Sequence, residues 1–201
     1  MLGGTTKALA AAGAAAMTFS ALTACATTNS GETFSFHSPG GQVEIFYDEE
    51  ERAPLEDFSG DSLMEPGTEI SLSDFEGQIV VLNAWGQWCA PCRAEVDDLE
   101  EVQQHLSQPG ENVQPAGTVL GINVRDPQPE IARDFVRDNG VTYPSIYDPP
   151  FRTAGALGGI PTSVIPTTVI LDKQHRPAAV FLREISAEDI LTVTDRLAAE
   201  A

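Results

Sequence analysis

The feature that most constrains this chain is a pair of cysteines, Cys89 and Cys92, separated by two residues. The pair follows an apolar run at 79–85 that reads as a buried strand, and the segment 90–106 after it reads as a helix. A CxxC motif at a strand-to-helix junction is typical of a redox centre. If the first cysteine stands at the helix start and the second in its first turn, the two sulfurs are within bonding reach. The sequence therefore predicts a redox-active disulfide.

The two cysteines are expected to play different roles. At a helix start, unpaired backbone N–H groups and the positive end of the helix dipole favour a thiolate over a thiol. This makes Cys89 the predicted nucleophile. Cys92, one turn further in, is the predicted resolving thiol, which attacks a mixed disulfide and releases the partner. Pro91 lies in the first turn, where its missing N–H costs the helix little.

Two other uses of the cysteine pair are less favoured. A zinc site needs about four ligands, but the chain has no second CxxC, and its three histidines are scattered through polar surroundings. A purely structural disulfide that closes so short a loop would constrain the unfolded chain little. We therefore expect redox chemistry at the thiols, with no metal and no other cofactor.

The first 24 residues have the composition of an export signal. Lys7 is their only charged residue, and the apolar segment 8–21 is too short and weak for a confident membrane-spanning helix. Residues 22–25, Leu-Thr-Ala-Cys, resemble the lipobox of bacterial lipoproteins. That resemblance implies cleavage before Cys25 and attachment of diacylglycerol to its thiol.

Lipidation would also account for the odd number of cysteines, because it leaves Cys89 and Cys92 as the only free thiols. Residues 25–32 would then be a lipidated tether on the outer face of a bacterial cytoplasmic membrane, held there by several acyl chains. The alternative is a plain signal peptide with Cys25 left free.

Charge excludes one class of partner. The chain has 30 acidic and 11 basic residues and a net charge of −19, which argues against binding to nucleic acid. The acid-rich segment 48–61 is expected to be a solvated loop. It follows a predicted β-hairpin, formed by 33–37 and 42–47 around a Ser-Pro-Gly-Gly turn, so that 33–65 is a separate N-terminal part.

Residues 66–201 alternate between strand and helix patterns, which predicts an α/β sandwich of three layers. In the helix at 130–139, Ile131, Phe135 and Val136 are expected to face the sheet. Residues 70–77 are predicted to form a short strand and a turn, and 141–148 is expected to be extended. The other predicted strands are 118–124, 167–172 and 178–183, and the other predicted helices are 151–157 and 187–199.

Two blocks carry a resemblance to a known family. Residues 81–95, which contain the CxxC motif, and residues 165–172, Ile-Pro-Thr-Thr-Val-Ile-Leu-Asp, resemble the TlpA/ResA branch of the thioredoxin-like proteins. The resemblance covers about residues 66–200. It implies a thioredoxin-like α/β/α sandwich with a central mixed sheet. It also implies an extracytoplasmic, often membrane-tethered thiol-disulfide oxidoreductase, and several such proteins reduce apocytochrome c before haem attachment.

The resemblance assigns the second block to the active site. It implies that Pro166 follows a cis peptide bond and faces the CxxC motif, and that Ile165 offers its backbone to the substrate. A cis X–Pro bond is rare and is kept for tight turns. Pro161, in a similar Ile-Pro-Thr sequence, is the second candidate because no strand follows it directly.

Glu95 matches the acidic position of a CxxCxxE pattern in the same family, whereas Asn83 stands where cytoplasmic thioredoxins have a buried Asp. One helical turn separates Glu95 from Cys92, so its carboxylate could exchange protons with that thiol or tune the thiol pKa values. The alternative is a first-turn carboxylate that complements the helix dipole.

Three nearby side chains have weaker assignments. Trp88 is expected to shield the disulfide and to offer a flat apolar surface to partners, and Trp85 is equally consistent with the core. Arg93 either favours the thiolate or is simply solvated.

The expected function is reduction of disulfides in exported proteins, with apocytochrome c as the leading substrate by analogy. In an oxidising compartment, a membrane thiol carrier would have to re-reduce the enzyme. The rivals are a disulfide oxidase of the same fold, a peroxidase, and a binding lipoprotein or copper chaperone that uses the CxxC motif as a ligand.

Overall fold

The computed structural model describes residues 1, 3–4, 33–109 and 115–200. The chain divides into two units, Met1–Ser30 and Gly31–Ala201, and all elements given below belong to the second. The predicted lipidation site Cys25 and the tether at 25–32 lie outside the described residues, as does nearly all of the predicted signal peptide. Within the described ranges, no helix is long and apolar enough to cross a bilayer.

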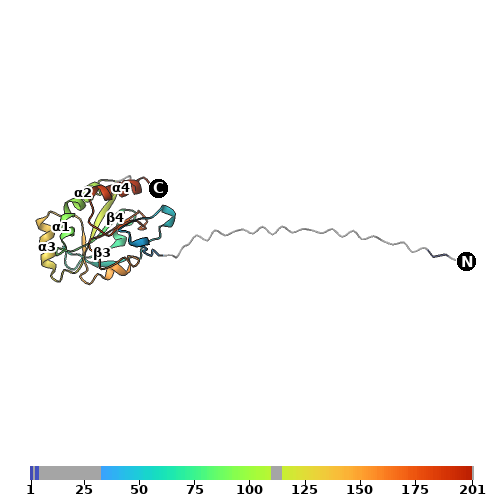
Figure 1. The fold of residues 1–201 in the computed structure, drawn as a ribbon, viewed down its shortest axis with the longest axis horizontal. Coiled ribbons are helices and arrows are strands. Elements are labelled where there is room, and N and C mark those ends of the chain that lie inside the picture. Colours follow the sequence, from blue (N-terminus) through green and yellow to red (C-terminus); the bar gives the residue numbers. More distant parts are fainter. Residues whose placement is uncertain (2, 5–32, 110–114, 201) are drawn as a thin grey trace. The chain divides into compact units, whose positions relative to one another are not determined.

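A six-stranded mixed sheet with the order β1-β8-β7-β4-β5-β6 forms the centre of this unit (Figure 1). β4 (Ile79–Trp85) runs parallel to β5 (Gly117–Asn123) and antiparallel to β7 (Thr167–Leu171). Every residue of these three strands is buried, as expected for strands covered on both faces. The outer strands are β1 (Glu44–Phe46), β6 (Ser145–Tyr147) and β8 (Pro177–Phe181).

The α-helices pack against one face of the sheet. α2 (Val96–Leu106) and α4 (Ala187–Ala198) share a core cluster with Ile79 and Val81 of β4. α3 (Pro129–Asp138) buries Ala132 and Val136 against Trp85, which points to the same face by strand alternation. In the described ranges, the opposite face is covered by loops and short 3₁₀ helices, which contribute Phe34, Leu55, Phe58, Phe151 and Leu157 to a second cluster.

The predicted N-terminal hairpin is wrong. β1 pairs with β8 at the edge of the central sheet, while the N–H groups of Phe34 and Phe36 donate to Pro54 O and Gly158 O. An isolated two-stranded hairpin is marginal in water, whereas β1 at the sheet edge buries Ile45 in the main core. Segment 33–65 is therefore part of the same compact unit as the rest.

The acidic segment is more ordered than a loop. It contains the 3₁₀ helix Glu49–Glu51 and the strand β2 (Ser59–Asp61), which pairs with β3 (Glu69–Ser71) in a separate two-stranded sheet.

Two helix predictions need correction. The single helix expected over 90–106 is interrupted at Glu95 (φ −88°, ψ 0°), which separates α1 (Ala90–Ala94) from α2. In α3, Ile131 is 46% exposed, and Ala132 takes its place against the sheet with Val136. Positions 132 and 136 are four residues apart and share one helix face, so residue 131 is rotated toward solvent.

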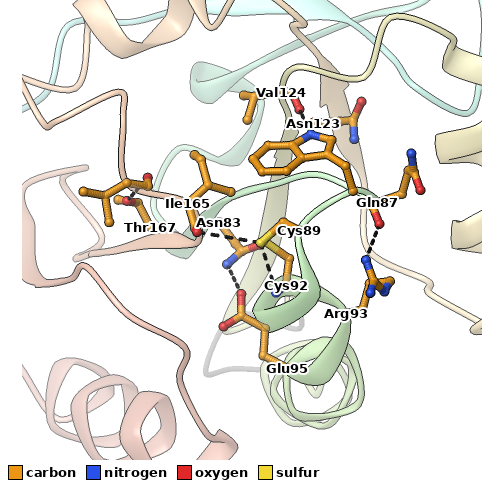
Figure 2. Close-up of a disulfide and its surroundings, with 12 residues drawn as sticks. Asn83, Gln87, Cys89, Cys92, Arg93, Glu95, Asn123, Val124, Ile165 and Thr167 are labelled. Atoms are coloured by element: carbon orange, nitrogen blue, oxygen red, sulfur yellow. Dashed lines mark hydrogen bonds between the residues drawn. A yellow bond between two sulfur atoms is a disulfide. The ribbon is translucent and has the colours of Figure 1, made fainter.

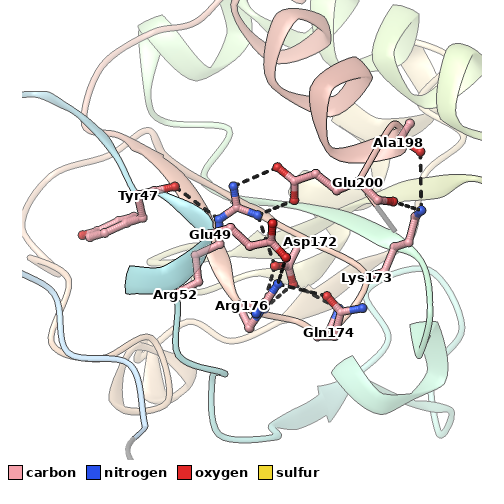
Figure 3. Close-up of polar contacts among 9 residues, drawn as sticks. All are labelled: Tyr47, Glu49, Arg52, Asp172, Lys173, Gln174, Arg176, Ala198 and Glu200. Carbon is pink, nitrogen blue, oxygen red and sulfur yellow. Dashed lines mark hydrogen bonds and ion pairs between the residues drawn. The ribbon is translucent and has the colours of Figure 1, made fainter.

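A buried charge cluster closes the sheet at the end opposite the CxxC motif (Figure 3). The Arg52 guanidinium lies 2.6 Å from the Glu200 carboxylate and 3.4 Å from that of Asp172. Arg176 lies 2.7 Å from Asp172 as well. The cluster joins the acidic N-terminal segment to the β7–β8 turn and to Glu200. The buried charges of Arg52 and Asp172 therefore both have partners.

Candidate active site

The strand-to-helix junction places the two cysteines together. Cys89 is the N-cap of α1, and its Sγ accepts a hydrogen bond of 3.2 Å from the Cys92 N–H. The two residues form the disulfide that the sequence predicts, with Cα atoms 5.3 Å apart. Each cysteine is 4% exposed in this oxidised state. The expected difference in role therefore depends on position in the helix and not on exposure of the disulfide.

The segment before β7 forms the opposite wall of the site. The Ile165–Pro166 bond is cis, as the resemblance implies, whereas the bond before Pro161 is trans. Ile165 O lies 3.7 Å from Cys89 Sγ, and Thr167 Oγ1 donates to Val164 O at 2.8 Å. Figure 2 shows Ile165 on one side of the disulfide and Gln87 on the other. The Ile165 carbonyl therefore lies directly beside the sulfur of Cys89.

The two tryptophans occupy different environments. Trp88 is 42% exposed, and its Nε1 donates to Val124 O at 3.0 Å. A Cβ at Gly86 would overlap the Trp88 ring, so the glycine lets the ring fold back across the loop. Trp85 is buried and packs against Phe135, which makes it a core residue. Of the two tryptophans, Trp88 is the one with a solvent-exposed ring.

Arg93 is exposed and donates to Gln87 O at 2.8 Å. The contact ties its guanidinium to the loop that precedes Cys89.

Glu95 and Asn83 form a fully buried polar pair beneath the disulfide. Both residues are 0% exposed. Glu95 Oε1 accepts from Asn83 Nδ2 at 2.9 Å, and Oε2 accepts from the Ile185 N–H at 3.1 Å. Asn83 Nδ2 also donates to Thr168 Oγ1 at 3.0 Å. Glu95 is therefore a core carboxyl group that is held by two hydrogen bonds and not a surface charge at a helix start.

Burial dominates the ionisation of this carboxyl group. Loss of solvent raises the pKa of Glu95 from 4.5 to about 7, although the hydrogen bonds from Asn83 and Ile185 oppose the change. Asn83, Cys92 and Tyr143 also line a cavity about the size of one water molecule. Burial there raises the pKa of the Tyr143 phenol as well. The Glu95 carboxyl group, with a pKa of about 7, is thus hydrogen-bonded to Asn83, which lines the cavity beside Cys92.

The comparison with family models now identifies the chain. Residues 51–176 match the AhpC/TSA family. The chain belongs to this family. ResA, a thiol-disulfide oxidoreductase from Geobacillus thermodenitrificans, is 30% identical over 124 residues, which is 62% of this chain. The match spans 66% of that relative, just under two thirds of its length.

Solved structures of similar proteins cover more of the chain. A secreted thiol-disulfide isomerase from Corynebacterium glutamicum is 65% identical with a TM-score of 0.80, over 84% of this chain and 99% of that one. A DsbF homologue from Corynebacterium diphtheriae is 61% identical with a TM-score of 0.76, over 82% and 99%. The chain therefore has a thioredoxin-like fold and is a protein-disulfide oxidoreductase, as these matches and the CxxC geometry together support.

Sequence reasoning missed one part of this oxidoreductase site, the segment that follows β5. Asp126 is buried, and its Oδ2 accepts from the Gln87 N–H at 3.0 Å and from Asn123 Nδ2 at 2.7 Å. Tyr147 also donates to Asp126 O at 2.8 Å. The signal was available, because the carboxyl ends of neighbouring parallel strands meet at one edge of a sheet. Polar residues directly after the second buried strand were therefore candidates for the site.

Within the described ranges, a metal site would need several His, Cys, Asp or Glu side chains close together. No group of three or more His, Cys, Asp or Glu residues there is arranged to hold a metal ion.

The buried carboxyl group predicts an inverse dependence of stability on pH. Because the pKa of Glu95 is raised from 4.5 to about 7 in the fold, the native state binds more protons than the unfolded state between these values, so stability falls as pH rises. We expect this residue to remove about 3 kcal/mol from the free energy of unfolding between pH 4.5 and 8. Urea unfolding of the oxidised protein at several pH values measures it.

Glu95→Gln is the matched control, because its amide does not titrate and the other carboxyl groups are unchanged. The free energy of unfolding of the wild type minus that of the variant should therefore fall by about 3 kcal/mol between pH 4.5 and 8. Parallel curves for the two proteins would contradict the assignment.

Proposed function

We propose that this protein reduces disulfides in exported polypeptides. The Cys89 thiolate attacks one sulfur of the substrate disulfide and releases one substrate thiolate, which takes up a proton. The Cys92 thiolate then attacks Cys89 Sγ and releases the second substrate thiol. Two electrons and two protons pass to the substrate, and the enzyme is left with the Cys89–Cys92 disulfide, the state in the structure.

The observation that carries this direction is the buried Glu95 carboxyl group. A strong oxidant of this fold gains its high potential when the protein stabilises the reduced thiolate form. A carboxylate buried at 0% exposure near Cys92 does the opposite, because its negative charge disfavours a neighbouring thiolate. Ionisation of a thiol therefore stabilises the reduced form little, so the reduction potential stays low. A low potential favours donation of electrons to the substrate.

The same carboxyl group suits the resolving step. Cys92 must lose a proton before it can attack the mixed disulfide. Glu95, with a pKa of about 7, is ionised in a large fraction of molecules at neutral pH and can accept that proton. A cavity about the size of one water molecule is lined by Cys92 and by Asn83, the residue that donates a hydrogen bond to Glu95.

The substrate is an extended polypeptide in this proposal. Ile165 O lies 3.7 Å from Cys89 Sγ and can accept a hydrogen bond from a substrate N–H, as a strand neighbour would donate it. The exposed face of Trp88 gives the substrate an apolar surface on the other side. Pro166 holds the Ile165 carbonyl toward the thiols through the cis bond.

The sequence and the names of the relatives support the proposed location, and the partners are part of the same proposal. A solved structure 65% identical to this chain carries the name of a secreted thiol-disulfide isomerase, and curated relatives carry the name ResA. With the lipobox-like residues 22–25, this supports an oxidoreductase anchored through Cys25 to the outer face of the cytoplasmic membrane. A membrane thiol carrier would re-reduce it, and apocytochrome c is the leading candidate substrate.

The measured reduction potential tests the direction. We expect a value for the Cys89–Cys92 couple near that of thioredoxin, about −270 mV, and well below the −120 mV or so of a strong oxidase. Glu95→Gln should raise the potential by up to about 30 mV at pH 7.5, because removal of the carboxylate makes the thiolate less costly. Equilibration with a glutathione buffer, read by thiol alkylation, gives both values. A potential above about −180 mV would favour the oxidase or isomerase direction.

Trapping identifies the substrate. Cys92→Ser keeps the predicted nucleophile and removes the resolving thiol, so substrate polypeptides should remain on Cys89 as mixed disulfides that a reductant releases. The double variant Cys89→Ser, Cys92→Ser is the control and should retain none. Equal recovery from both variants would favour a binding protein over a disulfide reductase.

Metabolic labelling tests the anchor. Cells that express the full chain and grow with a labelled fatty acid should incorporate label into the wild type, while Cys25→Ser should carry none and leave the membrane fraction. Absence of label from the wild type would point to a plain signal peptide with Cys25 free.

A further inference from the structure

One short segment, Val124–Asp126, is bonded to the loop that carries the CxxC motif. Val124 O accepts from Trp88 Nε1 at 3.0 Å, and Asp126 Oδ2 accepts from the Gln87 N–H at 3.0 Å. We call this segment the 124–126 loop. It follows β5 directly, so the central sheet fixes its position next to the end of β4.

The middle residue of the 124–126 loop reaches both walls around Cys89. The Arg125 guanidinium carbon lies 5.7 Å from the centre of the Trp88 ring, on the first wall. The same guanidinium donates to Thr162 O, in the segment that leads to the cis-proline on the second wall. No other described side chain contacts both the Trp88 ring and segment 160–164 through such interactions. Arg125 therefore spans the mouth of the site.

The backbone of Arg125 supports a specific role. Its φ is +57°, a left-handed conformation that is uncommon for a residue other than glycine. The Arg125 N–H donates to Pro149 O at 3.0 Å, which helps to hold this conformation. A left-handed residue persists where the surrounding structure holds it in place. In this chain, an arginine occupies a position that glycine would fill more easily, and its side chain makes the two cross-mouth contacts.

We propose that Arg125 is a positioning residue that ties Trp88 to segment 160–164 and so fixes the surface on which polypeptide substrates dock. The ring of Trp88 is 42% exposed and has one polar anchor, the bond to Val124 O. Arg125 adds a cation–π contact on the ring and links it to the wall that ends in Ile165. The inference rests on thiol-disulfide exchange at Cys89 and not on its direction.

This role separates two kinds of substrate. A small disulfide needs only Cys89 Sγ, whereas a polypeptide must lie over Trp88 and along the Ile165 carbonyl. Preorganisation of that surface lowers the cost of docking and leaves the chemistry at sulfur unchanged. Loss of Arg125 should therefore raise the substrate concentration needed for half-maximal rate with polypeptides, while the maximal rate stays constant.

Arg125→Gly is the decisive variant because glycine adopts a φ of +57° without strain, so only the side chain is lost. Reduced full-length protein is mixed with excess substrate in single turnovers, and remaining thiols are alkylated at each time. With insulin, the half-saturating concentration should rise about tenfold with little change in maximal rate. With neutral bis(2-hydroxyethyl) disulfide, the rate constant should stay within about twofold, which also shows that the variant is folded.

Two controls test whether Arg125 acts through Trp88 and not through charge. Arg137→Ala removes an exposed arginine of α3 whose ion pair, within the described part of the chain, is with Asp134, and it should leave both substrates unaffected. Trp88→Ala should weaken insulin binding, and the double variant with Arg125→Gly should be no weaker than Trp88→Ala alone, because Arg125 then has no ring to contact and coupled residues are not additive.

A spectroscopic signature completes the test. The chain has two tryptophans, and Trp85 is 5% exposed against 42% for Trp88, so acrylamide quenching reports mainly the latter. Quenching of the reduced protein should increase in Arg125→Gly. The proposal is overturned if quenching is unchanged, if both substrates lose equally, if the double variant is additive, or if Arg137→Ala matches Arg125→Gly. Trapping on Cys92→Ser still reports on the exchange activity itself in each of these cases.

Discussion

The pairing of β4 with its two neighbours is the constraint on which the active site depends. β4 runs parallel to β5 and antiparallel to β7, so the end of β4, the end of β5 and the start of β7 meet at one edge of the sheet. The first delivers the CxxC motif, the second the 124–126 loop, and the third the cis-proline. Three segments far apart in sequence thus surround one sulfur atom, and strands buried on both faces give them a rigid base.

A buried carboxyl group, that of Glu95, lies beneath the disulfide at that edge. Glu95 loses solvation in the core, and two hydrogen bonds recover only part of the cost, so its pKa rises to about 7. A neutral side chain of the same shape would serve the fold better at high pH. Local rules of stability are broken most often where a site needs an unusual group. The interruption between α1 and α2 falls at this residue, where the side chain turns into the core.

At the opposite end of the sheet, a cluster of charged side chains joins segments that are distant in sequence. Arg52 contacts Asp172 and Glu200 and so fastens the N-terminal segment and the chain end to the β7–β8 turn. Segment 33–65, which covers part of the sheet face without an α-helix, is thus held both by the pairing of β1 with β8 and by the ion pairs of Arg52. The redox site and this cluster occupy opposite ends of the same strands.

The sequence by itself determined the features that depend on neighbouring residues. The apolar run at 79–85, the helix start at Cys89 and the short spacing to Cys92 define the buried strand and the disulfide, because each follows from local geometry. The cis bond before Pro166 came from a resemblance to known proteins and not from the residues alone. Tertiary structure decided the rest. β1 pairs with β8 and not with its expected hairpin partner, because as an edge strand of the larger sheet it buries Ile45 in the main core. Glu95 became a core acid because Ile185, ninety residues away, supplies a buried N–H, and Arg125 met Trp88 only because β5 lies beside β4. Contacts between such distant residues depend on how the strands are ordered, which no local pattern in the sequence specifies.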